Sequence, residues 1–112
     1  MESDYKKYVE EQLPNRFVYE NDYGFLTYNK KADVLQLEEI YIKPIFRRLG
    51  HASKFYSEME KIGLEMRCNE LMGTIVIGTN NSEESMICLL KNGFKLHYTN
   101  GIVIYLNKKI GV

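Results

Sequence analysis

A strand, a loop, a helix and a second strand follow one another in the middle of this chain and constrain its fold most. Residues 34–42 are largely apolar and predict a strand, which Pro44 ends. A loop containing Gly50 leads into residues 52–66, whose apolar side chains recur at helical spacing. The run 71–77 is rich in β-branched residues and predicts a buried strand. Because a helix between two strands of one sheet makes a crossover, the pattern predicts a parallel pair.

Hairpins and helices are expected on both sides of this central unit. Residues 21–24 and 100–101 carry hairpin turn sequences. Ser82 is placed to cap a helix that Gly93 would end. The expected flanking elements are a helix at 3–13, strands at 16–20 and 25–29, a helix at 82–92, and strands at 94–99 and 102–107. The element order α-β-β-β-α-β-α-β-β predicts an α/β (α+β) fold, with a mixed, partly parallel sheet flanked by helices.

Length and charge limit the class of protein. A chain of 112 residues with 45% hydrophobic residues predicts one domain, residues 1–112, with a core of its own. The formal net charge is zero, which argues against a dedicated nucleic-acid binder or membrane-surface binder. We therefore expect neither a nucleic-acid partner nor a membrane partner.

The cysteines and histidines point to a cytoplasmic protein without a metal site. Cys68 and Cys88 form no closely spaced pair, and the sequence has no signal peptide and no apolar run long enough to span a bilayer. We expect a reducing cytoplasm and free thiols. His51 and His97 lie far apart in sequence and lack ligand spacing, so no metal is expected.

The loop Arg47-Arg48-Leu49-Gly50-His51-Ala52 has the properties of a phosphate-binding loop. The start of the following helix presents unpaired backbone N–H groups and the positive end of the helix dipole, and the arginines add positive charge. Gly50 lets the backbone approach a phosphate closely. An ordinary basic turn between a strand and a helix is the alternative reading of the same residues.

The same loop resembles the cofactor-binding motif of the GNAT superfamily of acyl-CoA-dependent N-acyltransferases. That motif reads Arg or Gln, two residues, Gly, one residue, then Gly or Ala, as residues 47–52 do here. Residues 40–44 are similar to the fourth strand of the family and the Pro that follows it. Residues 81–94 are similar to a second motif, an Asn-started helix followed by an aromatic-ending loop. The resemblance covers residues 16–107 and implies a GNAT-like domain whose N-terminal acceptor region is shortened.

The resemblance implies that the chain binds acetyl-CoA as a co-substrate. The loop would hold the pyrophosphate, mostly through backbone N–H groups, and the preceding strand would offer backbone groups to the pantetheine arm. The residues expected to contact acetyl-CoA are Ile40, Tyr41, Ile42, Arg47, Arg48, Leu49, Gly50, His51, Ala52, Ser53, Asn81 and Ser82.

Two adjacent carboxylates are the candidate catalytic groups. Strict strand alternation would place Glu38 on one face with Gln36 and Ile40, and Glu39 on the other face. We expect Glu38 to be the general base, because family members carry their acting side chain on that face, and Glu39 is the second candidate. Solvated carboxylates paired with Lys or Arg are the structural alternative. Leu89 stands where the family often has a Tyr that protonates the leaving thiolate.

The expected activity is transfer of an acetyl group from acetyl-CoA to a primary amine. The adjacent carboxylates favour a cationic acceptor, which is a protein lysine, a protein N-terminus or a polyamine-like small amine. The resemblance also allows a homodimer, because small members often complete their acceptor region through a neighbour. The alternatives are a catalytically degenerate acyl-CoA-binding module and a protein-interaction module with the same fold.

Overall fold

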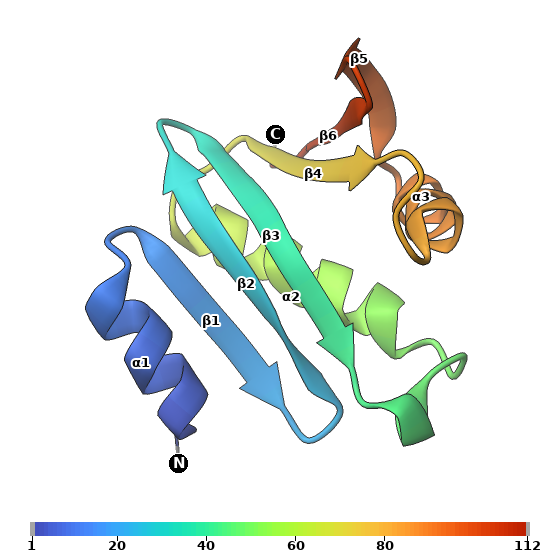
Figure 1. Cartoon of the computed structure of the whole chain (residues 1–112). Helices are drawn as coiled ribbons and strands as arrows, with labels where there is room; N and C mark the ends of the chain where they lie inside the picture. The colour runs from blue at the N-terminus through green and yellow to red at the C-terminus, as the bar shows by residue number, and fades with distance from the viewer. Residues whose placement is uncertain (1, 112) are drawn as a thin grey trace.

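The computed structural model describes residues 2–111 and has the element order that the sequence predicts (Figure 1). The elements are α1 (Asp4–Gln12), β1 (Arg16–Asn21), β2 (Gly24–Lys31), β3 (Val34–Ile42), the 3-10 turn η1 (Pro44–Phe46), α2 (His51–Glu65), β4 (Glu70–Val76), α3 (Ser82–Lys91), β5 (Lys95–Asn100) and β6 (Val103–Lys109). No helix in the described range is both long and apolar enough to cross a membrane.

The strands form one mixed sheet in the order β1-β2-β3-β4-β6-β5. The predicted parallel pair is confirmed: β3 and β4 run parallel, and every other neighbouring pair is antiparallel. The parallel pairing covers only Val34 to Gln36 on β3 and Glu70 to Met72 on β4. Beyond these residues the two strands fan apart, as Figure 1 shows.

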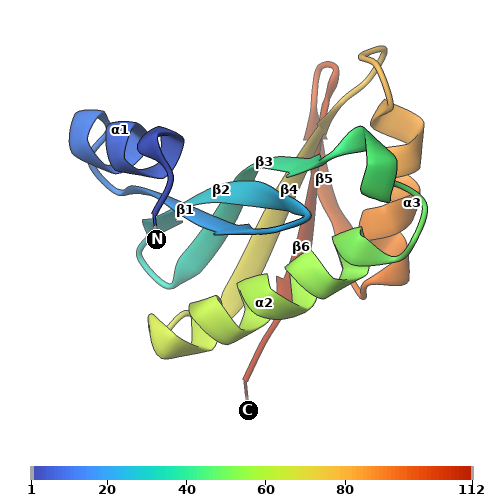
Figure 2. The same cartoon turned by 90° about the horizontal axis from the view of Figure 1, so that it is seen from below.

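Helices cover both faces of the sheet. Figure 2 shows α1 on one side of the strands and α2 on the other, with α3 beside β4 and β6. The core lies between the sheet and α2, where Phe55 and Met59 are almost fully buried with Leu26, Leu35 and Leu71. The spacing of these side chains along α2 is the helical spacing that the sequence predicts.

A bulge in β3 overturns the predicted alternation of its side chains. Leu37 pairs with Tyr28 of β2, and the next paired residue, Glu39, faces Thr27, so Glu38 is an extra residue. After this residue the faces exchange, and Ile40 packs against the core beside α2 as Leu37 does. Glu39 therefore lies on the face of the sheet opposite to that of Leu37 and Ile40. The expectation that Ile40 shares a face with Glu38 is wrong, because one inserted residue shifts the period-2 pattern.

The start of α1 and the end of α3 agree with the sequence prediction. Ser3 caps α1 by accepting a hydrogen bond from the backbone N–H of Lys6 at 3.1 Å. Gly93 ends α3 in a left-handed conformation with φ 90°, and the N–H of Phe94 returns to the carbonyl of Leu89 at 3.1 Å.

The start of α3 differs from the prediction. The N-cap residue is Asn81, in the left-handed region with φ 62°, and Ser82 is the first helical residue. The side chain of Asn81 makes no capping hydrogen bond. The prediction that Ser82 caps this helix is therefore wrong by one residue, because a left-handed Asn can end the preceding turn without a side-chain bond.

Candidate active site

A cleft of about 360 Å³ opens where β3 and β4 fan apart. Tyr56 of α2 and Leu89 of α3 line it on the face of the sheet that packs against α2. Glu39 and Thr74 line it too, and the bulge turns Glu39 toward the other face. The cleft therefore passes between the strands and connects the two faces of the sheet.

The edge of β3 toward β4 is open along the cleft. Within the described chain, strand pairing between β3 and β4 ends at Gln36, so the backbone beyond it has no partner strand on this side. Ile40, predicted from the sequence as a contact residue, lines the cleft, and Ile42 follows it along the same strand. An unpaired strand edge can hydrogen-bond an extended ligand that carries amide groups.

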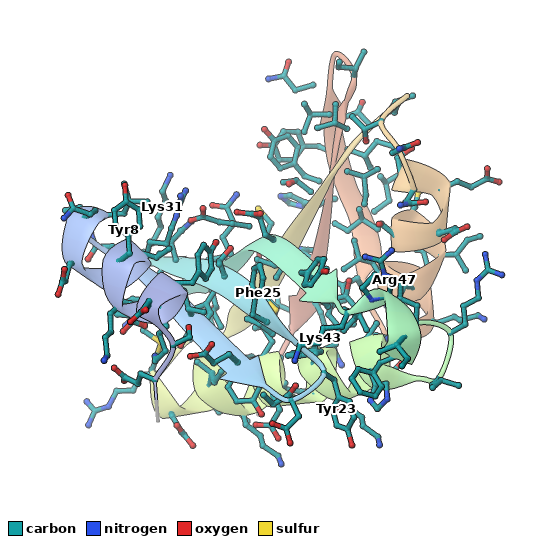
Figure 3. The ribbon with its side chains drawn as sticks, turned by 60° about the horizontal axis from the view of Figure 1, so that its bottom comes forward. Tyr8, Tyr23, Phe25, Lys31, Lys43 and Arg47 are labelled. Atoms are coloured by element: carbon teal, nitrogen blue, oxygen red, sulfur yellow. The ribbon has the colours of Figure 1, made fainter. Side chains whose placement is uncertain are left out.

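The loop between β3 and α2 is built around Arg47 and Gly50. The Nε of Arg47 donates a hydrogen bond to the carbonyl oxygen of Ile42 at 2.8 Å, and the guanidinium carbon lies 5.6 Å from the ring centroid of Tyr41. Figure 3 shows Arg47, Lys43 and Tyr23 gathered around this loop. The side chain of Arg47 is thus fixed against the end of β3.

Gly50 gives the loop both its turn and its open space. Its φ of 84° lies in the left-handed region, which favours glycine. A Cβ added there would meet no described atom within 4 Å, so the protein itself leaves the space free. The helix α2 begins at His51 without a side-chain cap and without an acidic residue in its first turn. Its first N–H groups are therefore available to an anion.

The ring of His51 packs against aromatic side chains and is not placed to contact a phosphate. It stacks on Tyr23 with the ring centroids 3.9 Å apart and lies edge-on to Phe46 at 5.9 Å. Its Nδ1 is buried without a hydrogen-bond partner in residues 2–111. What His51 offers at the start of α2 is its backbone N–H, and the aromatic contacts hold the loop against the β1–β2 hairpin.

The two carboxylates of β3 have different surroundings. Glu38 forms an ion pair with Arg16 and accepts a hydrogen bond from Nδ2 of Asn29 at 2.5 Å. Its side chain is only 17% exposed. Glu39 is exposed, and its carboxylate has no hydrogen-bond or ion-pair partner among the described residues. Glu39 is thus the carboxylate at the cleft whose oxygens are free.

Helix α1 brings a phenol close to these carboxylates. Burial, and then the negative charge of Glu39, raise the pKa of Tyr5 above its ordinary value. Tyr5 packs on Phe25 with the ring centroids 4.9 Å apart, and Phe25 stacks on Tyr41 at 5.4 Å. These three rings form an aromatic row from α1 to β3 on the face of the sheet that carries Glu39.

The remaining predicted residues divide between the cleft and the surface. Ser82 lines the cleft, whereas Asn81 is exposed at the turn before α3. Arg48 and Leu49 are exposed in the loop, and Ser53 of α2 accepts a hydrogen bond from Asn92 at 3.2 Å.

Sequence reasoning did not identify several residues of the site, namely Tyr5, Arg16, Asn29, Tyr56, Thr74 and Ser85. Tyr56 belongs to the apolar face of a helix, so helical spacing predicts it only as a core residue. The others reach the site through tertiary packing, for which the sequence carries no local signal.

Comparison with known proteins identifies the fold. No protein-family model matches the chain, and no curated protein matches its sequence. Many solved structures share the fold. A GNAT-family acetyltransferase from Desulfovibrio desulfuricans has a TM-score of 0.78 at 14% identity, over 94% of this chain and 78% of that one.

Two of the similar structures contain coenzyme A or acetyl-CoA. The PaiA N-acetyltransferase of Thermoplasma acidophilum, in complex with coenzyme A, has a TM-score of 0.74 at 19% identity, over 94% of this chain and 67% of that one. A GNAT-family acetyltransferase from Elizabethkingia anophelis with acetyl-CoA bound has a TM-score of 0.73 at 15% identity, over 94% of this chain and 83% of that one. The chain therefore has the GNAT fold.

Proposed function

We propose that the chain binds acetyl-CoA and transfers its acetyl group to a primary amine. The observation that carries this proposal is the cleft between β3 and β4, which has a free carboxylate, Glu39, on its wall. The uncapped start of α2, which follows β3 in the chain, adds a place for an anion. The coenzyme A and acetyl-CoA held by two proteins of the same fold support the choice of nucleotide.

The residues present fit acetyl-CoA at two points. The open space at Gly50 and the uncapped start of α2 suit the pyrophosphate. The unpaired edge of β3 suits the amide groups of the pantetheine arm. The residues assigned to acetyl-CoA are Ile40, Tyr41, Ile42, Arg47, Arg48, Leu49, Gly50, His51, Ala52, Ser53, Asn81 and Ser82.

The reaction is attack of a neutral amine on the thioester. The amine nitrogen forms a bond to the carbonyl carbon, the carbon–sulfur bond breaks, and the sulfur leaves with the electron pair as a thiolate. The proton lost by the nitrogen passes to a carboxylate, directly or through water. Holding both reactants in one site gives effective molarities of about 10⁵–10⁸ M, and a general base adds about 10²–10⁴-fold.

We assign the base to Glu39 in preference to Glu38. Both remain candidates from the sequence, but the oxygens of Glu38 are engaged by Arg16 and Asn29. A carboxylate with such partners must give up an ion pair before it can accept a proton, whereas Glu39 has its oxygens free. Glu38 instead forms an ion pair with Arg16 of β1.

The acceptor class follows from the same surroundings. A free carboxylate and the aromatic row of Tyr5, Phe25 and Tyr41 favour an amine that arrives as a cation. Protein lysines, protein N-termini and polyamines share this property, and a screen with one of each class distinguishes them. Light scattering of the same preparation tests the homodimer that the sequence resemblance allows.

The test of the proposal is acetyl-CoA binding measured by calorimetry. Gly50→Glu should abolish binding, because its carboxylate would occupy the space assigned to the pyrophosphate and repel it. Gly101→Glu is the matched control: Gly101 also has a left-handed φ, 61°, and open space, but it lies in the β5–β6 turn. No binding by the natural chain, or equal loss in both variants, would contradict the proposal.

A non-catalytic acyl-CoA-binding module is the second candidate function. Leu89, 2% exposed, is packed in the cleft wall at the position where the resemblance implies a Tyr. Acetyl-CoA binding without turnover of any amine in the screen would favour this module over an enzyme.

A further inference from the structure

A second cavity, of about 330 Å³, lies where β1 begins and β2 ends. We call it the basic cavity, because Arg16, Lys30 and Lys31 line it together with Asn29 and Glu38. Glu38 also lines the cleft between β3 and β4, so the basic cavity and the cleft are neighbours. A volume of this size suits a small molecule or a short part of a larger one.

The cleft and the basic cavity differ in charge. Among the described residues, the cleft is lined by the carboxylates of Glu38 and Glu39 and by no basic side chain. The basic cavity has three basic side chains and shares the carboxylate of Glu38 with the cleft. A ligand that reaches from one to the other therefore meets negative charge at one end and positive charge at the other. This pattern is complementary to a molecule with an ammonium and an anionic group.

Arg16 is held in place in the wall of the basic cavity. Asn15 has a left-handed backbone with φ 65°, and the N–H of Arg16 donates to the carbonyl oxygen of Leu13 at 3.2 Å, so a tight turn sets the start of β1. Arg16 lies opposite Asn29 in the register of β1 and β2, and its guanidinium forms an ion pair with Glu38. A guanidinium has several N–H donors, so one carboxylate does not use them all.

The two lysines give the basic cavity its excess of positive charge. The charge of Arg16 is balanced by Glu38, whereas neither lysine has an acidic partner among residues 2–111. Lys30 donates to the carbonyl oxygen of Met66 at 2.8 Å, which fixes its ammonium. Lys31 is exposed, and Figure 3 shows it far from Arg47 and its loop. The ammonium of Lys31 is therefore available to an anion that the loop does not hold.

A buried oxygen in the basic cavity lacks a donor. The Nδ2 of Asn29 donates to Glu38, and the Oδ1 of Asn29 is buried without a hydrogen-bond partner in the described part of the chain. A buried acceptor without a donor is costly. An N–H group of a ligand in the basic cavity would remove this cost, so the cavity suits a ligand with both an N–H and an anionic group.

We propose that the acceptor amine carries a carboxylate a few bonds away, and that Lys31 and Arg16 bind this carboxylate in the basic cavity while the amine faces Glu39 in the cleft. The inference rests on the proposed function and names its acceptor class. Amino acids and peptides with an acidic group belong to this class. Polyamines are disfavoured, because a second ammonium would face the two lysines. The carboxylate is bound and takes no part in the acetyl transfer.

The test compares acceptors that differ only in the carboxylate. Each ω-amino acid of a series of chain lengths is paired with the n-alkylamine and the diamine of the same carbon number. A short peptide with an acidic second residue is paired with its amide counterpart, which separates a peptide acceptor from a free amino acid. At saturating acetyl-CoA, the carboxylate should raise kcat/KM by about three- to tenfold over the alkylamine or the amide, mainly through a lower KM.

Lys31→Met should remove most of this preference, because it takes away the ammonium and keeps the length of the side chain. Lys31→Glu should invert it in favour of the diamine. Lys95→Met is the matched control: Lys95 is also exposed and has no ion-pair partner in the described range, but it lies on β5 and lines neither the cleft nor the basic cavity. This variant should keep the preference of the natural chain.

Arg16 is tested in the Glu38→Gln background, because removal of the guanidinium alone would leave the carboxylate of Glu38 unpaired. Arg16→Gln/Glu38→Gln should have a weaker preference for the carboxylate than Glu38→Gln. Equal preferences in these two proteins would remove Arg16 from the binding of the carboxylate.

Other outcomes would overturn the inference and leave the proposed function standing. These are equal kcat/KM values within every pair of acceptors, or a preference that survives unchanged in Lys31→Met. If no amine is turned over, calorimetry of the amino acids and the acidic peptide with the CoA-loaded protein decides. No binding, or equal binding by the natural chain and Lys31→Met, would then overturn the inference. Absence of acetyl-CoA binding by the natural chain would overturn the proposed function itself, and the inference with it.

Discussion

The ammonium of Lys6 donates a hydrogen bond to the backbone carbonyl oxygen of Val18 across 2.8 Å. The backbone N–H of Val18 donates to the carboxylate of Glu10 at 3.0 Å, and the two side chains form an ion pair at 2.9 Å. β1 is an edge strand of the sheet, and an edge strand exposes unpaired backbone groups. Helix α1 thus gives Val18, through two side chains, the hydrogen bonds that a neighbouring strand would give.

We predict that Glu10→Ala destabilises the protein by about 1–2 kcal/mol, because it leaves the N–H of Val18 without its acceptor. Urea unfolding gives the free-energy difference. Glu11→Ala is the control, since Glu11 is exposed on the same helix and has no hydrogen-bond partner among the described residues. Equal losses in the two variants would show that the edge contact contributes nothing.

A second contact of α1 predicts an acid-sensitive contribution to stability. The backbone N–H of Ser3 donates to the carboxylate of Glu20 at 2.8 Å, and this hydrogen bond lowers the pKa of Glu20 below its ordinary value of 4.5. A carboxylate whose pKa is lower in the folded state stabilises the protein above the unfolded pKa. The contribution is lost as pH falls through the folded pKa.

Glu20→Gln should therefore be less stable than the natural chain at neutral pH, with a difference that shrinks as pH falls below 4.5. Thermal unfolding midpoints of both proteins, measured from pH 7 to pH 3, check this. A difference that stays constant over the range would mean that the charge of Glu20 is not involved.

The assignment of the base gives a third prediction. Glu39→Gln should lower turnover by about 10²–10⁴-fold and leave acetyl-CoA affinity unchanged, because only the proton acceptor is lost. Glu38→Gln should have a smaller effect on turnover, since its contact with Asn29 can persist. Steady-state rates with the best amine of the acceptor screen compare the two variants.

The reverse order of these two effects would return the base to Glu38. Unchanged turnover in both variants would remove the carboxylates from the chemistry. Glu84→Gln is the control variant and should leave turnover unchanged, because Glu84 is exposed in the first turn of α3 and does not line the cleft.

The sequence predicted the parts of the fold that depend on local pattern. The crossover from β3 through α2 to β4 follows from side-chain periodicity and the turn residues Pro44 and Gly50, and the end of α3 follows from Gly93. The acetyl-CoA contacts that the sequence resemblance implies stay predictions: Ile40 and Ser82 line the cleft, whereas no residue of the loop 47–52 does.

The sequence did not predict the features that depend on tertiary packing. The bulge at Glu38 inserts a residue without a glycine or proline to mark it, so strict alternation assigned the faces of β3 wrongly. Tyr56 reads as a core residue because its spacing along α2 is that of Phe55 and Met59, yet it reaches the cleft. The contact of α1 with the edge of β1 joins side chains to backbone, which no sequence period encodes.

The wall of the cleft gives a last prediction. A Cβ added at Gly73 of β4 would lie 3.1 Å from a methyl carbon of Leu89, so Gly73→Ala should push Leu89 toward the cleft. We expect a loss of about 1–3 kcal/mol in stability from overpacking, together with weaker acetyl-CoA binding. The shorter side chain in Gly73→Ala/Leu89→Val should recover part of both losses, because the effects of substitutions at residues in contact are not additive.

Gly63→Ala separates packing from binding in this experiment. A Cβ at Gly63 of α2 would also crowd core side chains, at 2.9 Å from Ile110 and 3.1 Å from Leu71, but these residues do not line the cleft. This variant should lose stability like Gly73→Ala and keep its acetyl-CoA affinity. Unfolding curves and calorimetry of both variants decide the matter: if affinity falls equally in the two, the position of Leu89 does not set the width of the binding cleft.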